Sequence, residues 1–492
     1  MNPPTADTAP AVPARRASAS DPAGWLLAPL VLVAALLRFH LALRSPLWFE
    51  ELYVMLVARR SAAGALWIAI HDIHPPIPFL LRHALVAVGG DSPLAQKSLS
   101  IALSLLALPL AWRLVRRLFD ARVAALATAL MAVSFALVRY GQEVGMFSMQ
   151  WLLALALVDT WTLWLESGRR RDAVLGVAIA IVAVYTHYVF LAVEPLLFAW
   201  GLLALRRDRK RLAAWAGMHA LVAIAFVPQA PIFLAQVARE MTLRYSTFPT
   251  GESIAAYARF LGLHHRVLEW LFPLAGLLPL LDRTQRRAAI LMWLLVLLPP
   301  LSIRVIPLTF PTEFLFAAPF AYALVAAGLD RAPLRPARLA LCVLIVANSA
   351  WWSFRQPPFH EPVALQQELR TLRAHRAPGD LVLHSETHSL LFALYYDPAG
   401  RNRILVEDAG TQYFDGGLVI PDSARMTRSA FAAARSRGDA WWAFGVNRAR
   451  VARNVISRAG AAEVATFDSL AAGPHWVSPP VTLWQGLPEG KR

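Results

Sequence analysis

The chain has 492 residues, of which 57% are hydrophobic and only 16% are charged. A soluble surface needs more polar cover than this composition supplies, so an ordinary soluble protein is excluded. The net charge of +16 at neutral pH is compatible with nucleic-acid binding. The basic residues, however, fall in short clusters between apolar runs, which indicates membrane topology and argues against a nucleic-acid partner. The single cysteine, Cys342, excludes an intrachain disulfide and a multi-cysteine zinc site.

Residues 1–23 are rich in Pro, Ala, Ser and Thr, a composition too poor in large apolar groups to bury a core. We expect a disordered cytoplasmic tail. The following run, Trp25 to Leu43, is long enough to cross a bilayer of roughly 30 Å. It lacks a small-residue cleavage site and is therefore expected to be an uncleaved first span rather than a signal peptide.

Five basic clusters then indicate the topology, because positive residues gather on the cytoplasmic side. The clusters are residues 113–122, 169–171, 206–211, 283–287 and 331–338. Placing all five in the cytoplasm predicts about 11 transmembrane helices, a cytoplasmic N-terminus and an extracytoplasmic C-terminus. The predicted spans are residues 25–43, 93–112, 122–138, 147–165, 173–187, 188–205, 212–229, 267–281, 288–303, 313–329 and 338–353.

The apolar segment from Ile77 to Val88 is too short to span a bilayer at roughly 1.5 Å per residue. Counting it as a span would also place the first basic cluster on the wrong side. Residues 44–92 are therefore predicted to form one long external loop whose short helices lie on the membrane surface. A loop of this length usually has a function.

The composition changes to that of a soluble domain near residue 355, which divides the chain into a transmembrane domain (24–354) and a small α/β extracytoplasmic domain (355–492). Apolar alternation predicts strands and helices in this second part. The strands are expected at 381–384, 404–407, 440–444 and 464–467, and the helices at 362–375, 428–437 and 447–459. No glycine-rich phosphate loop is present, so a supporting or acceptor-binding role is favoured.

Carboxylates among apolar residues near a membrane surface are candidate functional residues, because partial burial of their charge is costly. Glu50 and Glu51 follow the first span directly and stand among aromatic residues. Neighbouring positions on a helix diverge by about 100°, so the two side chains are expected to have different roles. One is expected to face the site, and the other to cap or position the start of the helix. Glu143 lies in a second external loop, where capping of the next helix is an equally good interpretation.

His71, Asp72 and His74 precede two prolines in the long external loop. A spacing of three can present two histidines on one helical face, but two histidines without a defined third ligand make a weak metal signal. A polar entry to a proline-fixed turn is the more frequent arrangement. No cofactor is required by the sequence, and a divalent metal at His71, Asp72 and His74 stays open. His187 lies in a short external turn between Tyr185 and Tyr188.

The order of three motifs resembles the GT-C type of membrane glycosyltransferases, in particular the bacterial relatives of protein O-mannosyltransferases and lipid A aminoarabinose transferases. Their pattern runs Leu-Trp-x-Asp-Glu, His-Pro-Pro and Gln-Glu-x-Arg-x-Tyr. Here residues 47–51 read Leu-Trp-Phe-Glu-Glu, residues 74–76 read His-Pro-Pro, and residues 142–147 read Gln-Glu-Val-Gly-Met-Phe. The resemblance covers about the first 200 residues by motif, and the remainder by layout.

The resemblance implies a mainly α, polytopic, GT-C-like membrane protein of the bacterial inner membrane. It implies transfer of a sugar from a polyprenyl-phosphate donor to a hydroxyl of a lipid, glycan or protein acceptor on the extracytoplasmic face, with inversion. Glu50 is the counterpart of the catalytic aspartate and general base, Glu51 and Glu143 support it, and His74 lines the site. A carboxylate can take the acceptor proton while cations stabilise the departing phosphate.

Three positions depart from the family pattern. Glu50 replaces aspartate, Gly145 stands where the family has arginine, and residues 313–314 read Glu-Phe where many relatives have Arg-Tyr. Phosphate binding must therefore use other groups. The candidate binding residues are Lys97, Arg139, Gln142, His187, Arg244 and Arg304, together with His74 and the interfacial Arg44. Because these cations are missing, an alternative function is that of a non-catalytic relative that binds a polyprenyl glycolipid or a partner protein. A transporter is a weaker alternative, because no internal repeat is visible.

Overall fold

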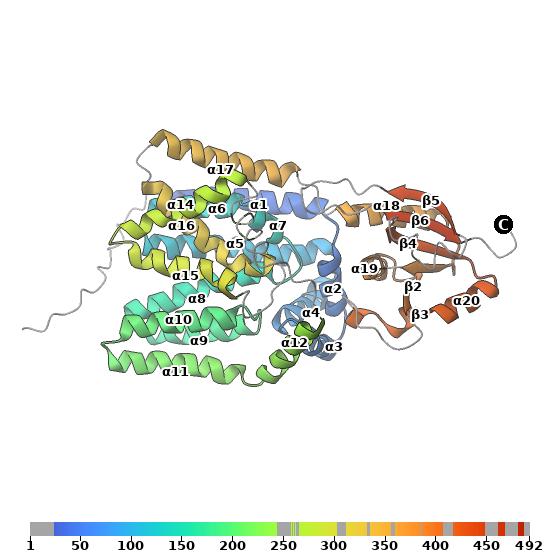
Figure 1. The fold of residues 1–492 in the computed structure, drawn as a ribbon, viewed down its shortest axis with the longest axis horizontal. Coiled ribbons are helices and arrows are strands. Elements are labelled where there is room, and N and C mark those ends of the chain that lie inside the picture. The colour runs from blue at the N-terminus through green and yellow to red at the C-terminus, as the bar shows by residue number, and fades with distance from the viewer. Residues whose placement is uncertain are drawn as a thin grey trace, which may run out of the picture.

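The structure is a computed structural model. It describes residues 24–243, 257, 259, 261, 265–302, 311–331, 335–355, 360–384, 386–406, 417–447, 461–467 and 481–486. The predicted tail, residues 1–23, and the candidates Arg244 and Arg304 lie outside the described residues. The described part is mostly helical and carries one small sheet (Figure 1).

Long helices lie side by side in a bundle (Figure 1). Each of the predicted spans coincides with a helix of this bundle. The helices are α1 (Leu27–Arg44), α5 (Pro93–Leu118), α6 (Ala121–Val133), α8 (Phe147–Ser167), α9 (Arg170–Val184), α10 (Phe190–Leu205), α11 (Arg209–Phe226), α14 (Arg266–Leu277), α15 (Arg286–Ser302), α16 (Ala318–Arg331) and α17 (Arg335–Arg355). A short 3₁₀ turn precedes α1 (Gly24–Leu26), and others follow α14 (Leu278–Leu281) and precede α16 (Pro311–Ala317).

By length and composition, three described helices are suited to cross a membrane: Gly24–Arg44, Pro93–Leu118 and Phe314–Arg331. A fourth is counted if Arg209–Phe226 and Ala230–Arg239, which meet at a bend of 64°, form one broken span. Several other bundle helices are short for a straight crossing, since 15 residues of α9 reach only about 22 Å. The number of eleven spans therefore stays a prediction.

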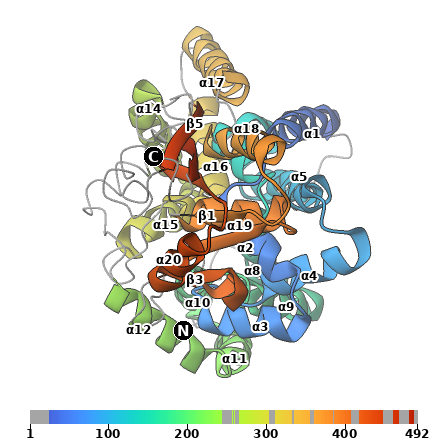
Figure 2. The same cartoon turned by 90° about the vertical axis from the view of Figure 1, so that its right-hand side faces the viewer.

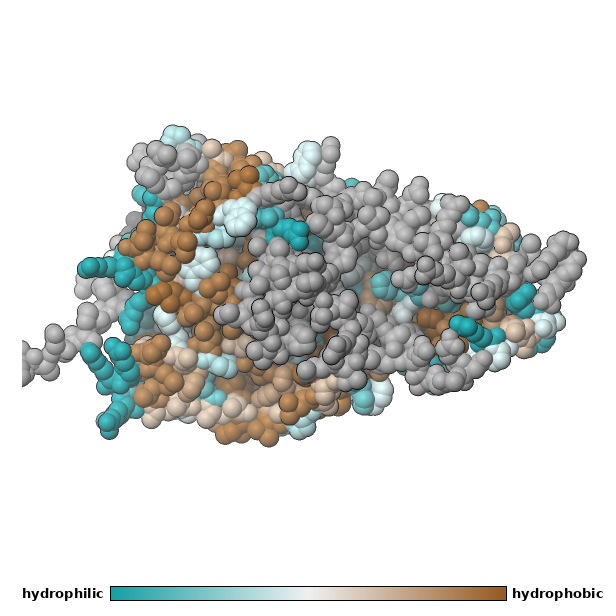
Figure 3. Space-filling view, viewed as in Figure 1, coloured by the Kyte–Doolittle hydropathy of each residue, from teal (hydrophilic) through white to brown (hydrophobic). Residues whose placement is uncertain are grey.

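The surface of the bundle has the distribution that a membrane protein needs. Figure 3 shows apolar side chains over the flank of the bundle and hydrophilic ones at the end remote from the sheet. Exposed apolar side chains include Leu36 and Leu43 on α1 and Leu221 and Ile224 on α11. Large apolar side chains exposed on a helix surface are stable where lipid covers them.

Shorter helices cover the opposite end of the bundle, between it and the sheet (Figures 1 and 2). Within residues 44–92 lie α2 (Phe49–Ala58), α3 (Ala62–His71) and α4 (Ile77–Gly89). The helix expected at Ile77 to Val88 is therefore present, with 13 residues. At this end the structure also has α7 (Phe135–Tyr140), directly after a break in α6, and α12 (Ala230–Leu243).

Side chains define where several of these helices begin. Ser61 Oγ accepts a hydrogen bond from the backbone N–H of Gly64, and Ser92 Oγ accepts one from Ala95. Asp120 accepts two backbone N–H groups at the start of α6. Each bond satisfies a donor that the first turn of a helix leaves without an intrahelical partner. The Ser92 cap thus marks the boundary between the loop of residues 44–92 and the long helix α5.

The C-terminal α/β unit runs from α18 to β6. Its helices are α18 (His360–His375), α19 (Thr387–Tyr396) and α20 (Arg428–Ser436), with 3₁₀ turns at Gly417–Val419 and Asp422–Ala424. Its six-stranded sheet has the order β3-β2-β1-β4-β6-β5. Strands β3, β2, β1 and β4 pair in parallel, and β6 pairs antiparallel with both β4 and β5. The strands are β1 (Leu381–His384), β2 (Arg401–Val406), β3 (Arg425–Thr427), β4 (Trp441–Asn447), β5 (Ala461–Phe467) and β6 (Val481–Gly486).

The predicted strands correspond to β1, β2, β4 and β5, and the predicted helices at 362–375 and 428–437 correspond to α18 and α20. Apart from Asn447, which ends β4, the third predicted helix, 447–459, lies outside the described residues. The sequence did not predict α19, β3 or β6. Residues 389–393 of α19 are all buried, so the helix has almost no polar face and its apolar run shows no helical alternation.

Candidate functional site

The start of α2 gives Glu50 and Glu51 different surroundings. Glu51 is buried, and its Oε2 accepts a hydrogen bond from the backbone N–H of Trp48 at 3.1 Å, which caps the first turn. Glu50, one position earlier, is exposed. Glu51 is thus the positioning member of the pair and Glu50 the solvent-facing one, as the 100° divergence of neighbours predicts.

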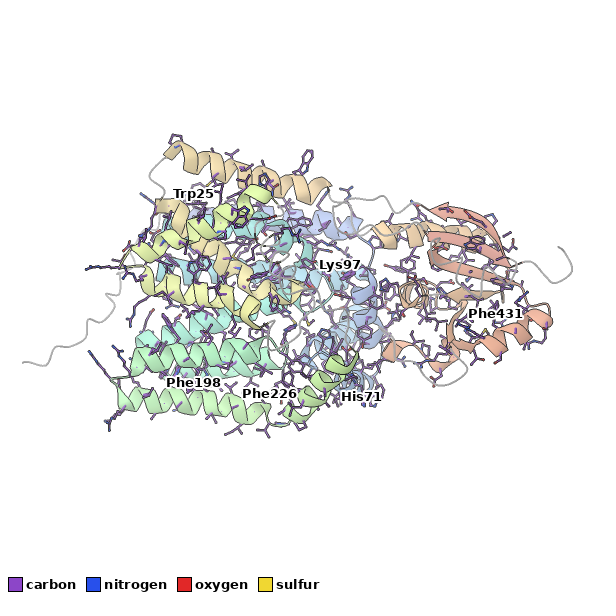
Figure 4. All side chains as sticks on the ribbon, in the orientation of Figure 1. Trp25, His71, Lys97, Phe198, Phe226 and Phe431 are labelled. Atoms are coloured by element: carbon purple, nitrogen blue, oxygen red, sulfur yellow. The ribbon has the colours of Figure 1, made fainter. Side chains whose placement is uncertain are left out.

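Lys97 lies near the start of α5, at the end of the bundle that faces α2 (Figure 4). Its side chain is fully buried, and its Nζ donates to the backbone oxygen of Ser45 at 2.7 Å. The same Nζ lies 3.8 Å from Oε1 of Glu51. A buried ammonium is tolerated when a carboxylate and hydrogen-bond acceptors compensate it, and Lys97 has both.

The loop between α7 and α8, residues 141–146, joins the same cluster. Oε1 of Glu51 accepts the backbone N–H of Val144 at 2.8 Å, although the two residues lie 93 positions apart. Gln142 is buried, and its Nε2 donates to the backbone oxygen of Arg139 at 3.1 Å. The first and third family-like motifs therefore meet through one carboxylate.

Glu143 is a buried carboxyl in this loop. Burial, and then the negative charge of Glu51, raises the pKa of Glu143 to about 8, while Arg139 and Lys97 oppose the shift. The raised pKa favours the protonated form of this carboxyl around neutral pH. The interactions that shift its pKa also show that Glu51, Lys97 and Arg139 lie close enough to share one electrostatic environment.

Arg82, on α4, is a member of the cluster that the sequence reasoning missed. Its buried guanidinium donates to Gln96 O at 2.5 Å, Ser100 Oγ at 2.5 Å and Gly145 O at 3.1 Å. Ser100 Oγ in turn donates to the backbone oxygen of Glu143 at 2.5 Å. Arg82 thereby holds the loop at Gly145, the position where the family has its own arginine.

Arg38, on the first span, was missed as well. It is buried and donates to Ser104 Oγ at 2.8 Å and to the backbone oxygens of Ala34 and Ala132. All of these acceptors are neutral. A Cβ added at Gly141 would lie 2.9 Å from Arg38 Nε, so the loop passes directly over this guanidinium. The available signal was the presence of an arginine inside an apolar run, which is costly in lipid and therefore informative.

His74 and His187 belong to a neighbouring polar group rather than to the Glu51 cluster. His74 Nδ1 lies 3.0 Å from Asp72 Oδ2, and its ring centroid lies 6.4 Å from that of His187. His187 is buried, and its Nδ1 accepts the backbone N–H of Val189. Arg239 of α12 donates to the backbone oxygen of Asp72. This geometry fits the simpler interpretation of His74, in which its side chain makes a local hydrogen bond at a turn fixed by proline.

The metal candidate does not assemble in the described part of the chain. His71 Nδ1 faces the backbone oxygen of Trp67 at 2.8 Å, and its ring stacks on the Trp67 indole. Figure 4 places His71 at the far end of α3, apart from Lys97. Within the described ranges, no three His, Cys, Asp or Glu side chains are grouped to hold a metal ion. Only Asp72 and His74 of the proposed ligands are in contact.

One family model matches a part of the chain that contributes residues to this site. Residues 73–234 match the family model described as dolichyl-phosphate-mannose-protein mannosyltransferase. None of the curated proteins matches the sequence. The matched segment contains the His-Pro-Pro motif, Lys97 and the loop with Glu143.

Solved structures agree with the fold. The apo structure of ArnT from Cupriavidus metallidurans superposes with a TM-score of 0.64 at 14% identity, covering 95% of this chain and 99% of that chain. The structure of the same protein bound to undecaprenyl phosphate gives a TM-score of 0.62 at 13% identity, with the same coverage. AglB from Archaeoglobus fulgidus, in complex with an inhibitory peptide and a dolichol-phosphate, gives 0.50 at 14% identity over 77% of this chain and 63% of that chain. Residues 73–234 thus match the mannosyltransferase family model, and the fold of the chain is similar to that of ArnT.

Proposed function

We propose that this chain is an integral membrane glycosyltransferase that transfers a sugar from a polyprenyl-phosphate donor to a hydroxyl of a lipid, glycan or protein acceptor. The observation that carries the proposal is the buried link from Lys97 through Glu51 to Val144. This link brings the helix that bears Glu50 to the loop that bears Glu143. The match of residues 73–234 to the dolichyl-phosphate-mannose-protein mannosyltransferase model supports the reaction class, and two structurally similar proteins with a bound polyprenyl phosphate support the donor.

The buried charges favour an anionic ligand. Four cationic side chains, Arg38, Lys97, Arg82 and Arg139, are buried on the elements around the loop, against two buried carboxyls, Glu51 and Glu143. Excess buried charge is costly unless a counter-charge arrives, and a lipid phosphate at the membrane edge would provide it.

These buried cations can replace the positive charges that the family motifs have and this chain lacks. Gly145 replaces an arginine, but Arg82 places a guanidinium at the backbone of the same residue. Arg38, Arg82 and Lys97 are each at most 1% exposed, so their contribution is a positive field rather than a direct contact. Arg139, which is less deeply buried, is the candidate for direct interaction with phosphate. Preorganised positive groups of this kind stabilise charge that develops on a leaving group.

In the proposed reaction, Glu50 takes the proton of the acceptor hydroxyl. The hydroxyl oxygen forms a bond to the anomeric carbon while the bond from that carbon to the phosphate oxygen breaks. The phosphate leaves with the electron pair on its polyprenyl carrier, and attack from the opposite side inverts the anomeric centre. The exposure of Glu50 at the start of α2 suits a base that must reach an acceptor.

The proposal includes a location and a topology. We assign the chain to the bacterial inner membrane, with about 11 spans, a cytoplasmic N-terminus and an extracytoplasmic C-terminal α/β unit. Its support is the coincidence of each predicted span with a bundle helix, and the position of the basic cluster 206–211 at the bundle end remote from the sheet (Figure 1).

The test uses the full chain in proteoliposomes with undecaprenyl-phosphate mannose and undecaprenyl-phosphate aminoarabinose, labelled in the sugar, and a membrane lipid extract as acceptor. Glu50→Gln should remove transfer while leaving membrane insertion intact. Glu166→Gln, which alters an exposed glutamate at the other end of α8, should transfer as the native protein does. Unchanged transfer by Glu50→Gln would show that Glu50 is not the base.

A binding protein without turnover makes a different prediction. It would be stabilised against heat by undecaprenyl phosphate and not by undecaprenol, yet would transfer no sugar from either donor. The catalytic proposal requires both stabilisation and transfer. Solute counterflow in the same proteoliposomes would instead favour a transporter.

A further inference from the structure

The C-terminal α/β unit contacts the helix that carries Glu50. Helix α19 packs on α2, and the views along two axes agree in placing these helices together (Figures 1 and 2). Leu52 and Met55 of α2 share one buried apolar cluster with Leu390 and Leu391 of α19. The external loop and the α/β unit therefore have a common core, and a shift of α19 is transmitted to α2.

Two contacts bracket the turn just before Glu50. The ring of His388 stacks on the ring of Phe49, with centroids 4.1 Å apart and an interplanar angle of 25°. The hydroxyl oxygen of Tyr396 accepts the backbone N–H of Leu47 at 3.3 Å. His388 is near the beginning of α19 and Tyr396 is its last residue, so the whole length of α19 spans the entry to α2.

The other end of α2 is held by the same unit. The guanidinium of Arg59 lies 4.0 Å from the centre of the Tyr395 ring and 2.7 Å from Asp91. Tyr395 donates its hydroxyl proton to the backbone oxygen of Asp91 at 2.5 Å. Arg60 donates to the backbone oxygen of Val419 at 2.9 Å. Helix α2 is thus fixed to the α/β unit at both ends.

From these contacts we infer that α19 positions the general base, with His388 and Tyr396 as positioning residues that act on Glu50 through Phe49 and Leu47. The inference rests on the proposed function for the role of Glu50. Lys97 and Val144 hold Glu51 from the membrane side, while α19 holds the preceding turn from the other side. The position of Glu50 therefore depends on the contacts that fix the start of α2 on both sides. A misplacement of the base by about 1 Å can lower the rate roughly a hundredfold.

The variants are His388→Ala, His388→Phe and Tyr396→Phe, made in the full chain. His388→Ala removes the stacked ring, whereas His388→Phe keeps a ring of similar size at the same place. Tyr396→Phe removes only the oxygen that accepts the Leu47 N–H. His375→Ala is the matched control, because His375 is an exposed histidine of the same unit that contacts its own helix α18.

Two measurements are needed. Hydrogen–deuterium exchange of residues 47–52 reports the order of the helix start without requiring turnover. We expect faster exchange there in His388→Ala and Tyr396→Phe, and native exchange in His388→Phe and His375→Ala. Transfer kinetics should show kcat lowered by about tenfold to a hundredfold in the first two variants. The KM for the donor should stay unchanged, and His388→Phe should restore kcat.

The outcomes separate the two proposals. Native exchange at residues 47–52 in both His388→Ala and Tyr396→Phe would overturn the positioning role, as would faster exchange with unchanged kcat. If the native protein transfers no sugar while exchange still accelerates, the proposed function fails and the hold of α19 on α2 stands. Faster exchange with lowered kcat and rescue by phenylalanine supports both.

Discussion

Lys97 Nζ lies 3.8 Å from Oε1 of Glu51, and both side chains are buried. The pair joins the start of α5 to the start of α2. Because Glu51 also accepts backbone N–H groups of Trp48 and Val144, its negative charge is distributed over three partners. Removal of Lys97 would leave a buried carboxylate with backbone donors alone.

Lys97→Met should lower the free energy of unfolding by about 3 kcal/mol, because it leaves the Glu51 charge without its counter-ion. It should also abolish sugar transfer. The double variant Lys97→Met/Glu51→Gln should recover most of the stability and none of the activity, which thermal unfolding in detergent and the transfer assay together measure. Lys210→Met, at an exposed position, is the control. Equal stability of the single and double variants would show that the pair is not coupled.

Arg82→Leu should loosen the loop at Gly145 and Glu143, since it deletes the donor to Gly145 O and the partner of Ser100. Transfer should fall by at least tenfold, on the order expected for a misplaced catalytic group. Ser100→Ala should have a smaller effect of the same kind, because it removes one hydrogen bond worth about 1 kcal/mol. Arg207→Leu, an exposed arginine between α10 and α11, controls for loss of one positive charge. Native kinetics in Arg82→Leu would contradict the assignment.

Glu143 makes a prediction about pH. Its pKa is raised from 4.5 to about 8 in the folded protein, so the carboxyl stays protonated there over a range in which the unfolded chain has lost the proton. The contribution of this group to stability is fully present below pH 4.5 and is lost as the pH rises through about 8. Glu143→Gln is neutral at every pH and should not show this loss.

The stability of Glu143→Gln minus that of the native protein should therefore increase from pH 6 to pH 8, with a slope approaching about 1.4 kcal/mol per pH unit. Thermal unfolding at a series of pH values measures it. Glu368, whose pKa burial also raises to about 8, titrates in both proteins and cancels in the difference. A difference that is flat with pH would mean that Glu143 is ionised at neutral pH.

Two glycines of one loop should respond differently to alanine. A Cβ at Gly141 would lie 2.3 Å from Leu137 O and 2.6 Å from Ser104 Oγ, whereas a Cβ at Gly145 would meet only Phe147, at 3.8 Å. Gly141→Ala should cost about 1–3 kcal/mol of stability and most of the activity, because the loop must move away from Arg38. Gly145→Ala should retain both properties. Equal behaviour in thermal unfolding and transfer would disprove the close approach at Gly141.

The positions of the helices were largely readable from the sequence. Apolar runs and basic clusters located the bundle helices, and the shortness of the segment from Ile77 to Val88 predicted a helix that does not span. These signals are local, because hydropathy depends only on neighbours in the chain. The same locality explains why α19 was missed, since its run from Thr387 to Tyr396 has no polar alternation.

The candidate site was located in part. An external position of Glu50, Glu51 and Glu143 was predicted from their place next to apolar runs and stays a prediction. The structure brings Glu51, Glu143, Lys97 and Arg139 together. It places His74 and His187 in a neighbouring group and leaves His71 apart. The sequence could not place Arg38 and Arg82 in the site, because it does not show which backbone oxygens an arginine side chain contacts in the folded protein.

By itself, the sequence determined that the chain lies in a membrane and that its chemistry-capable residues gather at one end of the apolar helices, because composition and charge bias act along the chain. Only the tertiary structure decided that Glu51 faces inward to Lys97 and Val144 while Glu50 stays exposed, and that α19 holds the start of α2. Those contacts join residues as far apart as Leu47 and Tyr396, and their geometry is set by packing, which no local pattern contains.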